Sequence, residues 1–353
     1  MVAANQNDES KQVEASQSGG GVLSWHRLGK PVLLVFSSTL ITLVGIELVL
    51  RLVGFSYQLY PEKIEFGAPT PAQIESGFLV DRELLWVTKD YFDKLDDGRA
   101  TAPALIFMGD STTEWGNYER YFHGLIHRDF PEANFSYATL GVPAWSSYQG
   151  LRQLERDVLP LKPRVITVYF GWNDHWKAFG IQDKDVAWVN SSMLFQFQKR
   201  SRIAQLITKA YVGLNDGDEG PLLRVSPQDF RSNLKEMARL AKANDITMVL
   251  LTAPTSHEKG KEPEYLKQRH VEDLANLIPL HQQYVAIVRE VAQSEDVLLC
   301  DLARVFEGFP RDRLRTKLFA QDGIHLQDEG DQVIAVHLYG CFEQYGLLDR
   351  IVR

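Results

Sequence analysis

The sequence has little cysteine, no stripe of basic residues and no internal repeat. Its two cysteines, Cys300 and Cys341, are too few for a disulfide framework and lack the paired spacing of a zinc site. Because Cys300 ends an apolar run and Cys341 lies in a helix-like stretch, we interpret them as separate buried thiols. A single bridge is the alternative for a domain outside the cytoplasm. The net charge of −8 and the missing basic stripe predict no nucleic-acid partner.

One long apolar run occurs near the N-terminus. Residues 31–50 are almost entirely apolar, and Glu47 is their one charged residue. A helix of about 20 residues measures about 30 Å, which is the hydrocarbon thickness of a bilayer. We therefore predict a transmembrane helix over 31–53. The alternative is a buried core helix, but no polar face emerges at helical spacing.

The flanks of this run predict how it is used. Residues 1–30 are expected to form a disordered tail, since most of them are polar and rich in Ser, Gln and Gly. The run is too long for a cleavable signal peptide, which favours a retained single-pass anchor. Arg27 and Lys30 precede it and favour a cytoplasmic N-terminus, with the larger part periplasmic or at the cell surface. Arg51 and Lys63 on the other side weaken this charge asymmetry.

The rest of the chain alternates between two kinds of segment. Residues 54–100 carry prolines and mixed aromatic and charged sequence, so we expect a juxtamembrane connector with some extended structure packed on the domain. Over 101–353, short apolar runs alternate with longer helix-like stretches. Strands are expected at 104–108, 133–138, 165–170, 246–251 and 297–300. Helices are expected near 114–128, 146–157, 227–244, 279–294 and 328–345. This alternation predicts an α/β domain whose parallel sheet is covered on both faces.

A serine follows the first predicted strand, in Gly109-Asp110-Ser111. In open α/β sheets, sites form at the carboxyl ends of strands. Helix-like sequence follows Ser111, so its side chain would lie near a helix N-terminus, where backbone N–H groups favour negative charge. Taken alone, the tripeptide also suits a plain helix cap.

Two further motifs supply the partners that a serine nucleophile needs. Asp322 and His325 form a D-x-x-H motif in one loop. A serine hydroxyl needs a base to take its proton, and the base needs a partner that fixes its tautomer. Asn173 follows another predicted strand, and its amide suits a developing oxyanion. The alternatives are a helix-capping Asp322 with a surface His325, and an asparagine chosen for its turn propensity.

With Ser111, Asn173, Asp322 and His325 in this order, the chain resembles the SGNH, or GDSL-like, hydrolases. The resemblance covers about 104–340. It implies a flavodoxin-like three-layer α/β/α fold with a five-stranded parallel sheet. It also implies that His325 accepts the proton of Ser111 while Asp322 orients His325. We expect no cofactor and no metal.

The resemblance is less clear in the family's glycine block. The position that usually holds the oxyanion glycine is occupied here by Ala144, which still has a backbone N–H. The resemblance therefore implies an oxyanion hole made by the N–H groups of Ser111 and Ala144 and by the side chain of Asn173. Gly141 is the second choice for the Ala144 position.

Several side chains near these motifs are candidates for substrate contact, namely Trp115, Trp172 and His175. Core filling is the alternative for the tryptophans, and a structural role is the alternative for the histidine. His257 and His270 lie in a charged stretch and are expected to face solvent. Residues 178–225 are long for a connection and predict an amphipathic helix, which would serve as a lid, as a face resting on the membrane, or as a surface helix.

These features predict a serine esterase acting on acyl groups, such as O-acetyl groups, of a small molecule, a cell-surface carbohydrate or a lipid. Acyl transfer to a polysaccharide hydroxyl is the nearest alternative, because it would use the same triad. A metal-dependent phosphoesterase is a further alternative that leaves Ser111 and Asn173 without roles. Its ligands would be Asp110, Asp174, Asp322, His175 and His325. The last alternative is a non-catalytic carbohydrate-binding module on the same fold.

Overall fold

The computed structural model describes residues 25–57, 77–133, 135–178, 181–190, 200–215, 222–267, 271 and 273–352. It divides into two compact units, Met1–Gly54 and Phe55–Arg353. Most of the tail predicted over 1–30 lies outside the described residues, and so does His270. We describe each unit by itself.

The first unit contains helix α1 (Trp25–Leu52). Its stretch Pro31–Leu52 has 22 residues and is long and apolar enough to cross a membrane. The hydroxyls of Ser37, Thr39 and Thr42 donate to backbone carbonyls four residues earlier. These polar groups are therefore satisfied inside the helix, as the interior of a bilayer requires. Length and composition suit the predicted span, and they suit a signal sequence as well.

The second unit is built on a five-stranded sheet with the order β4-β3-β5-β6-β7, and every neighbouring pair is parallel. Its strands are β3 (Leu105–Gly109), β4 (Tyr137–Thr139), β5 (Val165–Tyr169), β6 (Thr247–Leu251) and β7 (Leu298–Cys300). Numbered along the chain this order is 2-1-3-4-5, which is the flavodoxin-like arrangement. The predicted fold is confirmed. The chain leaves β3 for β4 on one side and later returns to β5 on the other, so β3 and β5 flank the topological switch point.

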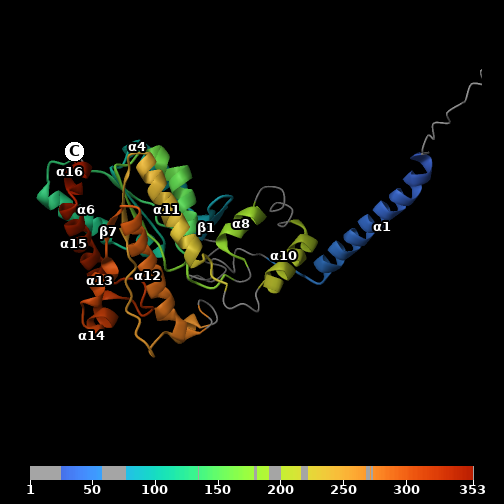
Figure 1. The fold of residues 1–353 in the computed structure, drawn as a ribbon. Helices are drawn as coiled ribbons and strands as arrows, with labels where there is room; N and C mark the ends of the chain where they lie inside the picture. Colours follow the sequence, from blue (N-terminus) through green and yellow to red (C-terminus); the bar gives the residue numbers. More distant parts are fainter. Residues whose placement is uncertain are drawn as a thin grey trace, which may run out of the picture. The chain divides into compact units, whose positions relative to one another are not determined.

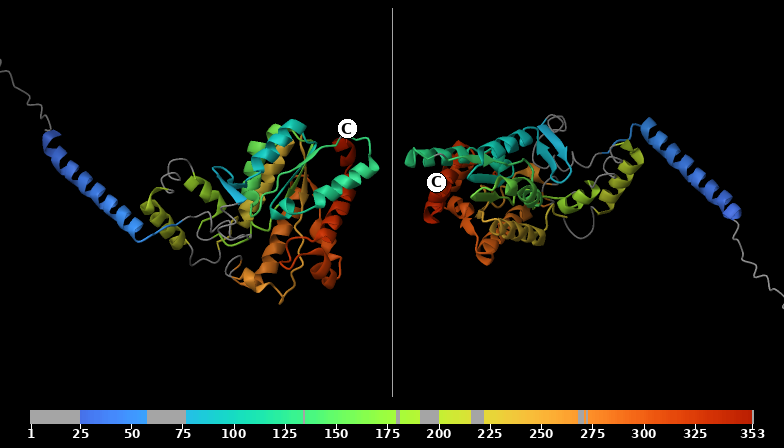
Figure 2. Two further views of the ribbon diagram at one scale, coloured as in Figure 1. Left: turned by 180° about the vertical axis from the view of Figure 1, so that it is seen from behind. Right: turned by 90° about the horizontal axis from the view of Figure 1, so that it is seen from above.

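Helices cover both faces of this sheet (Figure 1 and Figure 2). Along β3, Ile106 and Met108 belong to one buried hydrophobic cluster, whereas Leu105 and Phe107 belong to another. This alternation follows from the strand period of two and defines the two sides of the sheet. The first cluster packs on α7 (Ser147–Gln153), α11 (Pro227–Ala243) and α12 (Leu277–Ser294). The second packs on α6 (Tyr118–Asp129), α13 (Leu302–Glu307), α15 (Asp328–Gln344) and α16 (Leu347–Val352).

The other elements after residue 110 are mostly short. They are α5 (Ser111–Glu114), the π-helix η1 (Leu154–Val158), α8 (Asp183–Asn190), α10 (Arg202–Asn215), α14 (Arg311–Arg313) and the π-helix η5 (Leu314–Leu318), with 3-10 turns η2 (Leu159–Leu161), η3 (Glu264–Leu266) and η4 (Leu274–Asn276). Helix α10 falls within the stretch predicted to be amphipathic, and it exposes Ile207 and Leu214. Residues 179–180, 191–199 and 216–221 of that stretch lie outside the described residues.

The segment expected as a connector forms defined structure. It contains an antiparallel hairpin of β1 (Phe78–Asp81) and β2 (Leu85–Thr88), followed by α4 (Tyr91–Thr101). Trp86, Tyr91 and Leu95 lie in the same buried cluster as the first face of the sheet. The described part of 55–100 therefore packs in one unit with the five-stranded sheet.

Cys300 and Cys341 are joined by a disulfide, so the prediction of two separate thiols is wrong. Cys300 ends β7, and Cys341 lies on α15, which packs against that strand. Their Cα atoms are 5.9 Å apart, which is the usual separation for a bridge. Spacing along the chain could not reveal this pairing, because it depends on where α15 docks.

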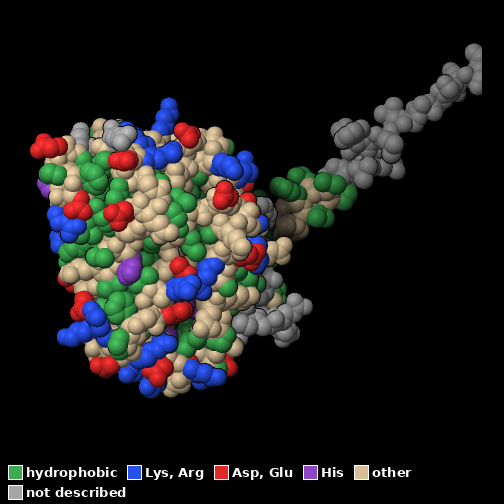
Figure 3. Space-filling view, turned by 60° about the vertical axis from the view of Figure 1, so that its left-hand side comes forward, with side chains coloured by type: hydrophobic (Ala, Val, Ile, Leu, Met, Phe, Trp, Pro, Cys, Tyr) green, Lys and Arg blue, Asp and Glu red, His purple; other side chains and the backbone are tan. Residues whose placement is uncertain are grey.

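The surface of the second unit mixes charges of both signs. In the face shown by Figure 3, Lys and Arg side chains are interspersed with Asp and Glu side chains. Such a mixed surface gives no extended field of one sign on this face.

Candidate active site

Ser111 lies where β3 passes into α5, at the carboxyl edge of the sheet. Asp110 forms the cap of α5, and its Oδ1 accepts hydrogen bonds from the backbone N–H and the hydroxyl of Thr112, at 2.9 and 2.8 Å. Burial raises the pKa of the Asp110 carboxyl. The cap leaves the neighbouring Ser111 at the first helical position, with 7% of its surface exposed.

The D-x-x-H loop meets Ser111 across the edge of the sheet. The Nε2 of His325 lies 2.8 Å from the Oγ of Ser111, and the Nδ1 of His325 lies 2.5 Å from the Oδ2 of Asp322. Serine, imidazole and carboxylate therefore form one continuous chain of hydrogen bonds. The side chains of His325 and Asp322 are 23% and 28% exposed, so solvent reaches one side of the chain.

The loop itself fixes the orientation of Asp322. The Oδ1 of Asp322 accepts hydrogen bonds from the backbone N–H groups of Ile324 and His325, at 2.9 and 3.0 Å. Burial by itself would raise the pKa of Asp322, but the hydrogen bond and charge of His325 and these two N–H groups bring it below the usual value. The carboxylate is thus held ionised and aimed at the Nδ1 of His325.

Asn173 reaches the same place from the end of β5. Its Nδ2 donates to the Oδ2 of Asp110, at 3.0 Å, and its side chain is buried. An amide nitrogen carries two hydrogens, so one remains after this bond. Asp110 therefore orients Asn173 beside the serine and caps the helix of Ser111 at the same time.

Ala144 holds a left-handed backbone conformation, with φ +64°. This is the conformation that glycine adopts without cost, and an alanine in it costs about 1–2 kcal/mol. Among the described residues, the backbone N–H groups of Ser111 and Ala144 donate no hydrogen bond to a backbone carbonyl in a turn, a loop or a helix cap. Gly141 has a packing reason of its own, because a Cβ there would lie 2.6 Å from the backbone nitrogen of Glu114.

The three candidates for substrate contact lie in different surroundings. Trp115 is 50% exposed, and its ring lies 5.1 Å from that of His325. Trp172 is buried and stacks on His281 with ring centroids 3.8 Å apart. His175 is fully buried, and its Nε2 lies 3.1 Å from the Nδ1 of His281. Only Trp115 of these three offers open surface beside the triad.

His257 does not face solvent, contrary to the expectation from its charged neighbours. It is buried, its ring packs edge-on against Trp172, and its Nε2 lies 2.7 Å from the backbone oxygen of Asp322. A Cβ on Gly323, whose φ is +73°, would lie 2.6 Å from the ring of His257. Burial lowers the pKa of His257. The position of His257 shortly after the strand predicted at 246–251 could have indicated this burial, because that strand ends at the same edge of the sheet as the strand before Ser111.

The residues of the metal-dependent alternative are engaged in separate contacts. Asp110 caps α5, and Asp174 accepts from the backbone N–H of Ser147 at 2.9 Å. The Nε2 of His175 lies 3.1 Å from the Nδ1 of His281, which stacks on Trp172. Among the described residues, no three His, Cys, Asp or Glu side chains are grouped so that they could hold a metal ion.

A flavodoxin-like sheet with a Ser-His-Asp chain at its switch point defines a class of α/β hydrolytic proteins. Within that class, the sequence model of the GDSL-like Lipase/Acylhydrolase family matches residues 107–333, which is more than half of the chain. The chain belongs to this family, and the predicted family is confirmed.

Individual relatives are more distant. The isoamyl acetate-hydrolyzing esterase 1 homolog of Bos taurus is 26% identical over 140 residues, which is 38% of this chain and 54% of the relative. The chain thus matches about half the length of this curated relative.

Solved structures show a similar degree of likeness. An alpha/beta hydrolase enzyme from the metagenome of Lake Arreo is 20% identical, with a TM-score of 0.45, over 69% of this chain and 95% of its own. A GDSL-like lipase from Bacteroides thetaiotaomicron is 18% identical, with a TM-score of 0.45, over 72% and 98%. An acetylxylan esterase from Geobacillus stearothermophilus is 17% identical, with a TM-score of 0.44, over 67% and 92%.

Proposed function

We propose that this protein is a serine esterase that cleaves carboxylic esters through an acyl-enzyme. The observation that carries the proposal is the hydrogen-bonded chain from the Oγ of Ser111 through His325 to Asp322. His325 takes the hydroxyl proton as Ser111 attacks the ester carbonyl, and Asp322 stabilises the imidazolium. His325 then returns the proton to the departing alcohol. Water, deprotonated by His325, releases the acid.

The oxyanion of this mechanism needs donors beside Ser111. The backbone N–H groups of Ser111 and Ala144 and the second amide hydrogen of Asn173 are the donors that we assign. Preorganised donors of this kind are each worth about 10²–10³-fold in kcat. The half-exposed Trp115 beside His325 is our candidate for contact with the acyl or alcohol group.

For the substrate and location we propose acyl esters, O-acetyl groups among them, outside the cytoplasm. Family membership supports cleavage of acyl esters in general, and the isoamyl acetate-hydrolyzing esterase homolog among the similar proteins supports short acyl groups. The Cys300–Cys341 bridge supports an oxidising compartment. The apolar helix α1 supports a membrane anchor that holds the enzyme there.

The test is the Ser111→Ala variant with p-nitrophenyl acetate as substrate. Loss of the nucleophile is expected to lower kcat by about 10⁴–10⁶-fold while the thermal midpoint stays within a few degrees. Labelling by a fluorophosphonate, mapped by mass spectrometry, should fall on Ser111 in the parent protein and vanish in the variant. Wild-type turnover by Ser111→Ala contradicts the assignment.

A further inference from the structure

The loop that carries Ala144 is clamped by a tryptophan from outside the family-matched region. Trp86 lies on β2, whereas the family match begins at residue 107. The Nε1 of Trp86 donates to the backbone oxygen of Pro143, at 3.1 Å. In return, the Nε1 of Trp145 donates to the backbone oxygen of Trp86, at 2.8 Å. These two bonds fall on the residues immediately before and after Ala144.

The other side of the loop is tied down by a buried ion pair. Ser146 Oγ donates to the Oδ2 of Asp183 at 2.7 Å, and Asp183 pairs with Arg224 at 2.8 Å. Both charged side chains have no exposed surface. The guanidinium of Arg224 also lies over the ring of Trp86, at 5.7 Å. The pair therefore joins Ser146 and Trp86 in one contiguous structure around Ala144.

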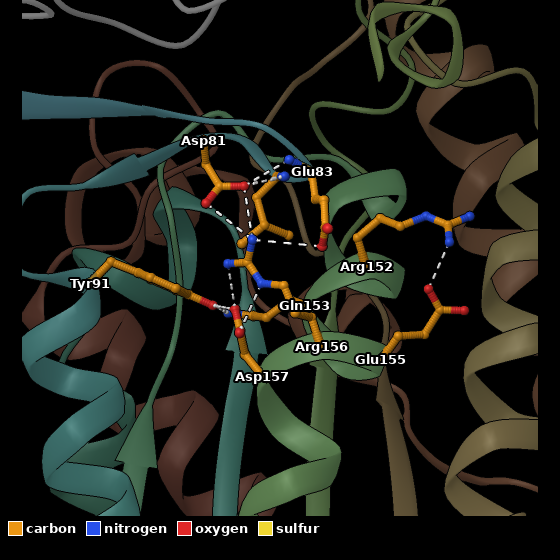
Figure 4. A network of polar contacts seen from close by, with 9 residues as sticks. Asp81, Glu83, Tyr91, Arg152, Gln153, Glu155, Arg156 and Asp157 are labelled. Carbon is orange, nitrogen blue, oxygen red and sulfur yellow. Dashed lines mark hydrogen bonds and ion pairs between the residues drawn. The ribbon is translucent and has the colours of Figure 1, made fainter. Parts of the chain in front are cut away.

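The hairpin that presents Trp86 is itself fixed to the helices of the hydrolase fold. Figure 4 shows the guanidinium of Arg156, on η1, between the carboxylates of Asp81 and Asp157. Arg156 donates to both oxygens of Asp81, at 2.9 and 3.0 Å. Asp157 in turn accepts from the hydroxyl of Tyr91, at 2.7 Å. Asp81 also caps the hairpin turn through the N–H groups of Glu83 and Leu84.

A left-handed alanine persists only where its surroundings over-determine the backbone. The contacts of Trp86, Trp145 and Asp183 supply that determination on both sides of Ala144. We propose that Trp86 is a positioning residue, which holds the N–H of Ala144 in the orientation needed for the oxyanion. This inference rests on the proposed function and extends it to a segment that the family match does not include.

The decisive variant is Trp86→Phe, which removes the bond to Pro143 and keeps an aromatic ring. With p-nitrophenyl acetate we expect kcat to fall about 10-fold to 100-fold, while KM changes less than about 3-fold, because the lost interaction acts in the transition state. Tyr345→Phe is the matched control. It also removes an aromatic donor to a backbone carbonyl, Leu299 O at 2.8 Å, but at β7, and should keep the parent kcat.

A second substitution tests whether Trp86 acts through Ala144. Glycine adopts the left-handed conformation without strain, so the loop needs the clamp less in an Ala144→Gly background. The kcat loss caused by Trp86→Phe should therefore be at least about 5-fold smaller in that background than in the parent. An equal loss in both backgrounds overturns the proposal, as does parent-like kcat in folded Trp86→Phe.

A measurement without catalysis separates this proposal from the proposed function. Hydrogen exchange of the peptide spanning 140–150 should quicken in Trp86→Phe and stay unchanged in Tyr345→Phe. If Trp86→Phe does not fold, Trp145→Phe removes the reciprocal bond and carries the same expectations. Unchanged exchange overturns the clamp even if the esterase assignment stands. A fully active Ser111→Ala overturns the esterase assignment while the exchange result still reports on the clamp.

Discussion

Ala144 occupies the position at which the family resemblance implies a glycine, and its backbone shows what an alanine costs there. At φ +64° an alanine is destabilised by about 1–2 kcal/mol relative to its preferred conformation. Glycine would remove that cost, although its greater freedom in the unfolded chain offsets about 0.4–1 kcal/mol. The contacts of the neighbouring residues, and not the intrinsic preference of residue 144, therefore set the shape of this loop.

Ala144→Gly is expected to raise the free energy of unfolding by about 0.5–1 kcal/mol, because relief of strain exceeds the entropic offset. Urea denaturation measures it. Ala102→Gly is the control, since Ala102 ends α4 with φ +46° far from the triad loop and should gain a similar amount. If Ala102→Gly stabilises and Ala144→Gly destabilises, the alanine methyl packs favourably enough to outweigh its strain.

At this scale the sequence identified, through short motifs, the residues to which we assign the chemistry. Ser111, Asn173, Asp322 and His325 each follow an apolar run or sit in a tight spacing, and the structure brings all four together. The sequence could not reveal the packing of Trp86 on Pro143, because these residues are 57 positions apart and no local pattern links them.

Among the elements, α6 and α15 enclose two acidic side chains. Glu119 on α6 and Asp331 on α15 are 3% and 2% exposed. Burial, with the charge of Asp331 adding to it, raises the pKa of Glu119 to about 8. Burial, with Asp328 adding to it, raises the pKa of Asp331 to about 6. Packing of the two helices therefore raises the pH at which each acid ionises.

The stability of the second unit should therefore fall as the pH rises. Glu119 has a higher pKa in the folded state, about 8, than in the unfolded state, about 4.3. Its contribution to the free energy of unfolding is fully present below the unfolded pKa and is lost as the pH rises through the folded pKa. Between pH 5 and pH 8.5 the free energy of unfolding should fall by on the order of a few kcal/mol, and Glu119→Gln should remove much of this fall. Urea midpoints across that range measure it. Glu343→Gln, an exposed position on α15, should leave the profile unchanged. A parent midpoint that is flat over this range contradicts the prediction.

The disulfide joins β7 to α15 and closes a 41-residue separation. In the chain-entropy account, such a closure stabilises by about 3–4 kcal/mol. We expect dithiothreitol to lower the free energy of unfolding of the parent protein by that amount. The Cys300→Ala and Cys341→Ala double variant should show the lower value with or without reductant. Two free thiols in the unreduced, unfolded protein would show that no bridge forms.

Elements were predictable where hydrophobic periodicity is strong and local. Helices α11, α12 and α15 begin and end within about two residues of their expected bounds. The strand expected at 133–138 lies instead at Tyr137–Thr139. Its position is set by pairing with β3, and the apolar content of the segment does not determine it. Some extended structure was expected within 54–100, but the strands of the β1–β2 hairpin were not located, since four-residue strands in mixed aromatic and charged sequence give no period to detect.

At the scale of the whole molecule, the two units have different physical requirements. The second unit has its own buried core on both sides of the sheet, and every residue assigned to the chemistry lies within it. Helix α1 exposes large apolar side chains along its length, among them Leu33, Leu34 and Phe36. Such a surface is unfavourable in water and requires a bilayer or removal of the helix.

A chain beginning at Phe55 should therefore be soluble and keep the kcat of the full chain for p-nitrophenyl acetate, because no residue of the triad or the clamp precedes it. The full chain should sediment with membranes and resist extraction at alkaline pH, as an apolar span of 22 residues does. Intact mass decides between the two uses of α1. A membrane-bound protein with the full mass means a retained anchor. A soluble product that lacks α1 means a signal sequence, and the anchor part of the proposal is then wrong while the esterase assignment stands.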